Sequence, residues 1–99
     1  MSRDPFFSVA VSSSEGGTVV AVAGELDVAT APELALALAA VDGEVTVDLS
    51  GATFADPSAL RVLLAASSAG CRLRVVRRHG GPVARLLALT DTERMLHVA

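Results

Sequence analysis

Residues 45–60 of the chain read VTVDLSGATFADPSAL, and this stretch decides the fold class. Its first five residues alternate apolar and polar side chains, which predicts a β-strand. The next segment, 50–53, is rich in small residues and predicts a loop. Asp56 then fits the N-cap of a helix, because its carboxylate can accept a backbone N–H, and Pro57 fits the first helical position. A strand that leads at once into a helix is the repeating unit of an α/β fold.

The same two periodicities alternate along the rest of the chain. Apolar residues with a period of two predict strands near 6–12, 18–23, 45–49 and 72–76. The segment 19–23 is a continuous apolar run, which predicts a strand buried on both faces. Leucines and valines at helical spacing predict helices near 31–41, 57–68 and 82–89. In the middle helix, Leu64 lies within the apolar stripe, and Leu64→Ala should lower the stability by about 2–5 kcal/mol if the side chain is fully buried.

The first helix carries a start signal of its own. Thr30 is followed by Glu33 three residues later, which is the pattern of a capping box. Pro32 falls in the first turn, where its missing N–H does no harm. Thr30 is therefore predicted to cap the helix with its side chain.

The element order ββαβαβα predicts one α/β domain over residues 1–99. A Ser/Gly-rich loop, 12–17, joins the first two strands and indicates an antiparallel hairpin. Each later strand follows a helix that can serve as a parallel crossover. We therefore expect an open mixed β-sheet packed by about three to four helices, with Met95 to Val98 as a short terminal strand or helix end.

Composition excludes several classes of function. The 99 residues carry a net charge of −3 and only three aromatic side chains, which argues against nucleic acid as a partner. Cys71 is the single cysteine, so no disulfide can form within the chain, and a reducing compartment fits. The longest apolar run is the eight residues of 34–41, too short to span a membrane. With no signal peptide predicted, we expect a cytoplasmic protein.

The chain offers no pattern that is typical of catalysis or of metal binding. His79 and His97 are the only histidines, and no nucleophile elbow accompanies them. One cysteine and two separated histidines do not make a metal site. We therefore expect no enzyme activity, no metal and no cofactor. Four arginines, at positions 72, 74, 77 and 78, form a basic strip that is either a solvated strand face or a dock for an acidic partner.

Ser58 lies in the first turn of the predicted second helix. Free backbone N–H groups and the helix dipole favour a phosphate at such a position. A phosphoserine adds about −1.5 to −2 charge at pH 7, which is enough to change a contact surface. By physical chemistry alone, the segment is either an ordinary helix start or a phosphorylation switch.

Three motifs resemble the STAS domains, the family of bacterial anti-sigma factor antagonists. Residues 24–32, GELDVATAP, closely resemble the signature at the start of the family's first helix. Residues 45–50 resemble its third strand, which is followed by a phenylalanine and then Asp-Ser-Ser-Gly-Leu; here that segment is FADPSAL, 54–60. Residues 89–96, LTDTERML, resemble its closing segment.

The resemblance implies a regulatory protein that binds an anti-sigma factor. In the family this partner is also a serine kinase, and phosphorylation of the second hydroxyl in the motif releases the antagonist. The matching hydroxyl is that of Ser58, which we expect to lie exposed beside the acidic residues Asp27 and Asp56. The residues expected to bind the partner are Asp27, Thr30, Asp56, Pro57, Ser58, Ala59 and Arg61.

The sequence departs from the family pattern at two positions of this motif. Pro57 replaces the first hydroxyl, and Ala59 replaces the glycine. A second hypothesis therefore stays open, in which the chain is a non-phosphorylated STAS scaffold or an accessory subunit of a signalling or transport complex. A phosphorylation assay with a candidate kinase distinguishes this hypothesis from the phosphorylation switch.

Overall fold

The computed structural model describes residues 7–14, 16–90 and 96 of the chain. In these residues it contains four strands and three helices, in the predicted ββαβαβα order. They are β1 (Ser8–Ser14), β2 (Gly17–Leu26), α1 (Ala31–Ala39), β3 (Glu44–Ala55), α2 (Pro57–Ser68), β4 (Arg72–Val76) and α3 (Pro82–Thr90).

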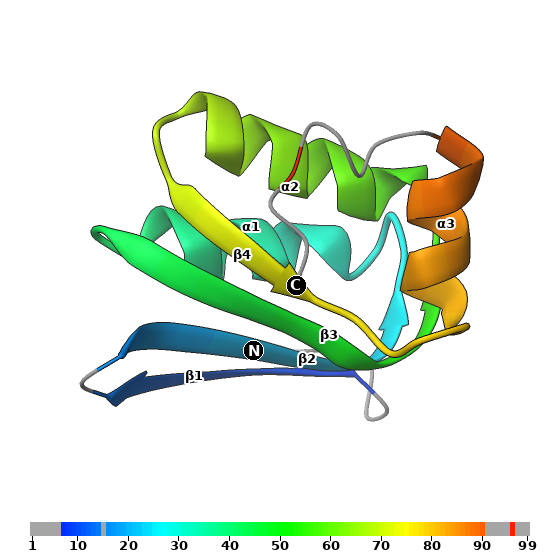
Figure 1. Ribbon diagram of the computed structural model, residues 1–99, viewed down its shortest axis with the longest axis horizontal. Helices are drawn as coiled ribbons and strands as arrows, with labels where there is room; N and C mark the ends of the chain where they lie inside the picture. Colours follow the sequence, from blue (N-terminus) through cyan, green and yellow to red (C-terminus); the bar gives the residue numbers. More distant parts are fainter. Residues whose placement is uncertain (1–6, 15, 91–95, 97–99) are drawn as a thin grey trace.

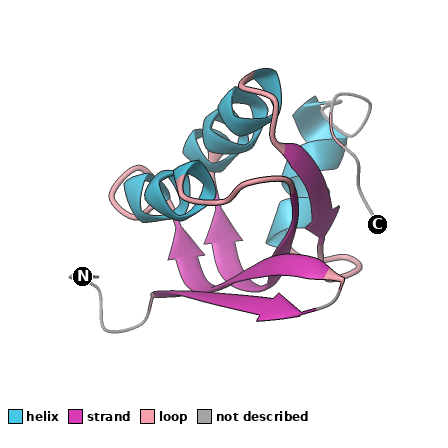
Figure 2. Cartoon of the chain, turned by 90° about the vertical axis from the view of Figure 1, so that its left-hand side faces the viewer, coloured by secondary structure: helices cyan, strands magenta, loops and turns pink. Residues whose placement is uncertain are grey.

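The strands form an open mixed sheet in the order β1-β2-β3-β4. β1 and β2 pair as an antiparallel hairpin, whereas β2–β3 and β3–β4 are parallel pairs. The helices α1 and α2 are the crossovers between the parallel strands, and they lie side by side (Figure 1). Figure 2 shows the same arrangement from the side, with α3 separate from this pair. The predicted fold class is confirmed.

The core lies between the sheet and the helices and is built from valine and leucine. Its largest fully buried side chains come from every helix and from β2, β3 and β4, and they are Val20, Leu26, Leu34, Val47, Leu49, Leu63, Val75 and Leu87. Only part of segment 19–23 belongs to it, because Val20 and Val22 are buried while Ala23 is exposed. The prediction that this strand is buried on both faces is therefore wrong, since the helices cover only one face of the sheet along it.

β3 continues through the segment that was predicted to be a loop. Residues 50–53 stay within the strand, and Gly51 and Ala52 pair with Ala23 and Gly24 of β2, so β3 runs on to Ala55 and β2 to Leu26. Two register shifts accompany this pairing, one between Ala21 and Ala23 and one between Gly24 and Glu25. At each shift β3 supplies one extra residue, as in a β-bulge. The small residues at 50–53 thus mark irregular pairing rather than a turn.

Two glycines permit this irregular pairing. Gly24 has a φ of +99°, a conformation that residues with a side chain rarely adopt. Gly51 faces the neighbouring strand so closely that an added Cβ would lie 2.8 Å from the backbone oxygen of Val22. Both strands can therefore continue side by side to their carboxyl ends, after which α1 and α2 begin.

Two further expectations concern the helices and the end of the chain. Leu64 packs against the core but is only partly buried, so the condition for a loss of about 2–5 kcal/mol is not met, and its neighbour Leu63 is the fully buried residue of α2. Of the predicted terminal element, Met95 to Val98, only Leu96 is among the described residues, and it is buried. Along residues 7–14 and 16–90, no helix is long and apolar enough to cross a membrane.

Candidate functional site

The start of α2 has the geometry that its sequence predicts. Asp56 is in an extended conformation, with φ −120° and ψ 178°, and its Oδ1 accepts a hydrogen bond from the backbone N–H of Ser58 at 2.8 Å. Pro57 occupies the first helical position, where no N–H is needed. The carboxylate thus satisfies a helix donor that would otherwise lack a partner within the helix.

Side chains in the first turn of α2 differ in their exposure. Pro57 and Arg61 are exposed, and Ser58 is partly exposed rather than fully exposed as expected. Because Ser58 and Arg61 are three residues apart in a helix, their side chains lie on the same face. Ala59 points the other way and is only 2% exposed. The surface at this helix start therefore presents a hydroxyl and a guanidinium group.

The loop between β2 and α1 is held together by hydrogen bonds from Asp27 and Thr30. Oδ1 of Asp27 accepts the backbone N–H groups of Ala29 and Thr30, at 2.9 and 3.1 Å. The hydroxyl of Thr30 donates to the carbonyl oxygen of Glu25 at 2.7 Å and accepts the N–H of Asp27 at 2.9 Å. Asp27 and Thr30 therefore fix the path of the chain between strand and helix.

The predicted capping box is wrong. The side chain of Thr30 makes no capping hydrogen bond to α1. Thr30 has a φ of −102° and a ψ of −22°, close to helical values, whereas a side-chain cap needs an extended residue. Its hydroxyl turns back to the loop instead.

The parallel pairing of β2 and β3 brings the two acidic segments together. Leu26 and Ala55, the last residues of the two strands, are partners, and the N–H of Asp56 donates to the carbonyl oxygen of Leu26 at 3.2 Å. Asp27 and Asp56 are the residues that directly follow this pair. Both are partly exposed, so two carboxylates lie at the carboxyl end of the β2–β3 pair, where α2 also begins.

Two exposed apolar side chains at this edge were not recognised in the sequence. Val28 follows Asp27 and is 74% exposed, and Phe54 lies two residues before Asp56 and is 48% exposed. The register places Phe54 opposite Glu25, at the end of the β2–β3 pair. Each lies within two residues of an acidic side chain in the sequence, but no periodicity in the sequence marks either of them as exposed.

We call the surface formed by Asp27, Val28, Phe54, Asp56, Pro57, Ser58 and Arg61 the α2 start surface. Thr30 and Ala59, which were also expected to bind a partner, are 4% and 2% exposed. Their side chains therefore lie below the exposed surface, and their contact with a partner stays a prediction.

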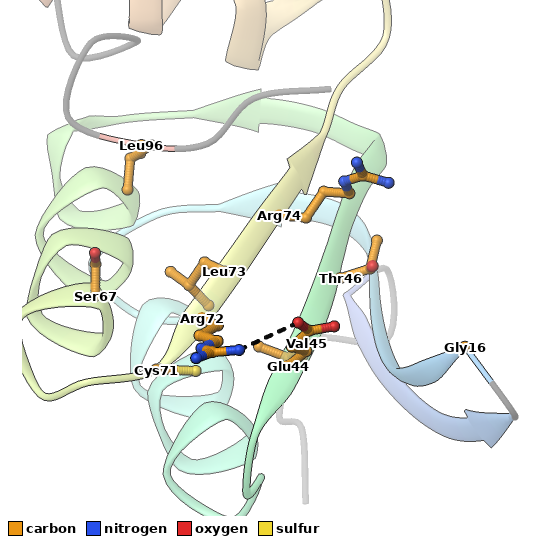
Figure 3. Close-up of a pocket in the computed structure, with 10 residues that line it drawn as sticks. All are labelled: Gly16, Glu44, Val45, Thr46, Ser67, Cys71, Arg72, Leu73, Arg74 and Leu96. Carbon is orange, nitrogen blue, oxygen red and sulfur yellow. Dashed lines mark hydrogen bonds and ion pairs between the residues drawn. The ribbon is translucent and has the colours of Figure 1, made fainter.

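Two hollows lie elsewhere on the molecule. An apolar groove of about 610 Å³ runs between α1 and α2, and Arg61 lies at its margin. A second hollow, of about 530 Å³, lies at the opposite end of β3 (Figure 3). There Arg72 and Glu44 form an ion pair at 3.5 Å, with side chains that are 78% and 70% exposed. An ion pair this exposed contributes little to the stability of the fold.

Cys71 is the one lining residue that the two hollows share. Burial raises the pKa of the Cys71 thiol, which lies at both hollows, so its reactive thiolate form is disfavoured. Among the described residues, no group of three histidine, cysteine, aspartate or glutamate side chains could hold a metal ion.

The model for the family "Mlab, STAS domain" matches residues 9–97. The chain belongs to the STAS domain family. It is similar to an anti-sigma factor antagonist from Mycobacterium paratuberculosis, with 28% sequence identity and a TM-score of 0.82. The alignment covers 96% of this STAS domain and 87% of that chain.

A second solved structure supports the fold alone. The STAS domain of an antisigma-factor antagonist from Rhodobacter sphaeroides is 24% identical, with a TM-score of 0.56 over 72% of this chain and 86% of that one. No curated protein matches this STAS domain. The chain therefore has an STAS fold like that of anti-sigma factor antagonists.

Proposed function

We propose that the protein binds an anti-sigma factor through the α2 start surface and is released when that factor phosphorylates Ser58. One observation carries the proposal: Ser58 is partly exposed in the first turn of α2, at the edge of the sheet where Asp27 and Asp56 meet. The similarity to anti-sigma factor antagonists supports the class of partner. In the cell, such an antagonist would free the sigma factor in the cytoplasm.

The composition of the surface supports a protein partner. Val28 and Phe54 are large apolar side chains that are 74% and 48% exposed, and a partner would bury this exposed surface. Pro57 adds a rigid apolar contact beside Ser58. Arg61 and the two carboxylates add charges to the α2 start surface, and such charges would set the orientation and specificity of binding.

The proposed switch depends on charge. The kinase would transfer the γ-phosphoryl group of ATP to Oγ of Ser58, with loss of the hydroxyl proton and departure of ADP. The new group carries about −1.5 to −2 charge at pH 7. Asp27 and Asp56 would repel it, whereas the N-terminus of α2 would stabilise it locally. We therefore expect the domain to stay folded while its complex with the partner weakens.

A non-phosphorylated role in a signalling or transport complex is the second candidate. It is favoured by Pro57, which stands where the family has a hydroxyl and removes one N–H from the helix start. In this role, the α2 start surface would bind its partner permanently.

The deciding experiment is incubation of the purified protein with the candidate anti-sigma kinase, Mg²⁺ and ATP, followed by peptide mass spectrometry. We expect one phosphate on Ser58 and none in the Ser58→Ala variant. The Ser67→Ala variant, changed at the far end of the same helix, is the matched control and should be phosphorylated like the natural protein. Tight binding without phosphate on Ser58 would exclude the switch and leave the second candidate.

A further inference from the structure

β1 is an open edge of the sheet. It pairs only with β2 in the described residues, and it lies at the margin of the fold (Figure 1). Half of the backbone N–H and C=O groups of an edge strand point away from the sheet. Such a row can pair with a strand from another molecule unless the protein prevents it.

The two edges of the sheet differ in how they are protected. β4, the other edge, is five residues long and carries Arg72 and Arg74, which are exposed. Charged side chains on a short strand discourage edge-to-edge pairing. β1 is seven residues long, reads SVAVSSS, and contains neither a charged residue nor a proline. Only the β1 edge therefore lacks protection from its own sequence.

Val11 lies at the midpoint of β1 and is 55% exposed. Its cross-strand partner is Val20, which is fully buried. Directly opposite residues in an antiparallel pair point to the same face, so Val11 points to the helix-covered face of the sheet. More than half of its surface stays uncovered there, although the same face is apolar in the next strand.

We propose that β1 pairs with β1 of a second copy of this chain, antiparallel and centred on Val11. All seven residues of both strands overlap only in this register. A slip by one residue would turn the helix-covered faces of the two copies to opposite sides. In the proposed register the two Val11 side chains lie directly opposite each other, and the two four-stranded sheets become one continuous sheet.

The first test is sedimentation velocity over a range of protein concentrations up to about 1 mM, which is high enough to detect even a weak dimer. We expect a reversible dimer for the natural protein. Val11→Lys places two like charges directly opposite each other, and it should raise the dimer dissociation constant by about tenfold or more. Leu89→Lys is the matched control, because it adds the same charge at a side chain of α3 that is 85% exposed. It should leave the dimer unchanged.

The second test fixes the register and does not depend on how the lysine variant folds. Directly opposite residues have Cα atoms about 4.5–5.5 Å apart, within the range that a disulfide spans. In a Cys71→Ala background, Val11→Cys should therefore cross-link two copies under mild oxidation. Ser13→Cys, on the same face of β1, would lie about 13 Å from its copy and should not cross-link.

A natural protein that stays monomeric at every concentration would overturn the proposal. So would equal cross-linking of the Val11→Cys and Ser13→Cys variants, or a dimer that Leu89→Lys weakens as much as Val11→Lys. Because β1 lies outside the α2 start surface, these results are independent of phosphorylation at Ser58.

Discussion

The backbone N–H of Ser58 donates a hydrogen bond of 2.8 Å to Oδ1 of Asp56. The residue that we propose as the phosphate acceptor is thus held in place by the carboxylate that caps its helix. A phosphate on Ser58 would bring a second negative group close to this carboxylate. The start of α2 is therefore the part of the fold that phosphorylation would perturb first.

Asp56→Ala should destabilise the protein by about 0.5–2 kcal/mol, because the first turn of α2 loses its cap. Asp56→Asn keeps a side-chain oxygen that can cap the helix, so this variant should lose much less stability. Urea unfolding of the two variants measures the difference. Equal losses in both would show that the charge of Asp56, and not its capping bond, stabilises the helix.

Ser58→Asp should weaken binding to the anti-sigma factor, because it places a permanent negative charge beside Asp27 and Asp56. Ser58→Ala should bind as the natural protein does. Titration calorimetry with the purified partner measures both. Ser67→Asp adds the same charge near the other end of α2 and serves as the control; a loss as large as that of Ser58→Asp would contradict a local effect.

Thr30→Val should destabilise the fold by about 1–3 kcal/mol, because a buried hydroxyl and its hydrogen bonds to Glu25 and Asp27 are lost without a change of shape. Thr30→Ser keeps the hydroxyl and should retain most of this stability. Chemical unfolding is the measurement. If the valine variant is as stable as the natural protein, the hydroxyl does not hold the β2–α1 loop.

Gly51→Ala should destabilise the protein by about 1–3 kcal/mol, because the added methyl group meets the backbone oxygen of Val22 and forces β2 and β3 apart. Thr53→Ala, at an exposed position of the same strand, should change the free energy of unfolding by less than about 0.5 kcal/mol. Thermal and urea melts distinguish them. A stable Gly51→Ala variant would mean that the bulge adapts freely.

Leu63→Ala should lower the free energy of unfolding by about 2–5 kcal/mol, since Leu63 is fully buried. Leu64→Ala should cost clearly less, because Leu64 keeps part of its surface in water. Denaturant unfolding of the pair tests which of the two leucines faces the core. A larger loss for Leu64→Ala would reverse the assignment of the buried face of α2.

The sequence predicted the elements well where a local pattern and the tertiary fold agree. The alternation at Val45, Val47 and Leu49 and the cap at Asp56 are both local signals, and both are confirmed. The segment 50–53 was mistaken for a loop because its small residues are typical of turns. Its extended conformation comes from pairing with β2, which is a contact distant in sequence.

The candidate site was predicted in part for the same reason. Asp56 and Pro57 occupy the expected positions because capping is a local interaction. The burial of Thr30 and Ala59 and the exposure of Val28 and Phe54 depend on how the strand ends meet the helices. No periodicity in the sequence encodes that arrangement.

The hydrogen bonds of Asp27 and Thr30 have a consequence for the thermodynamics of recognition. A loop that is ordered before its partner arrives loses little conformational entropy on binding. In the proposed complex, most of the interaction energy at the α2 start surface would then be available as affinity, even from a small contact area. One phosphate on Ser58 would be enough to reverse the proposed association, because the domain would not need to refold on either side of the equilibrium.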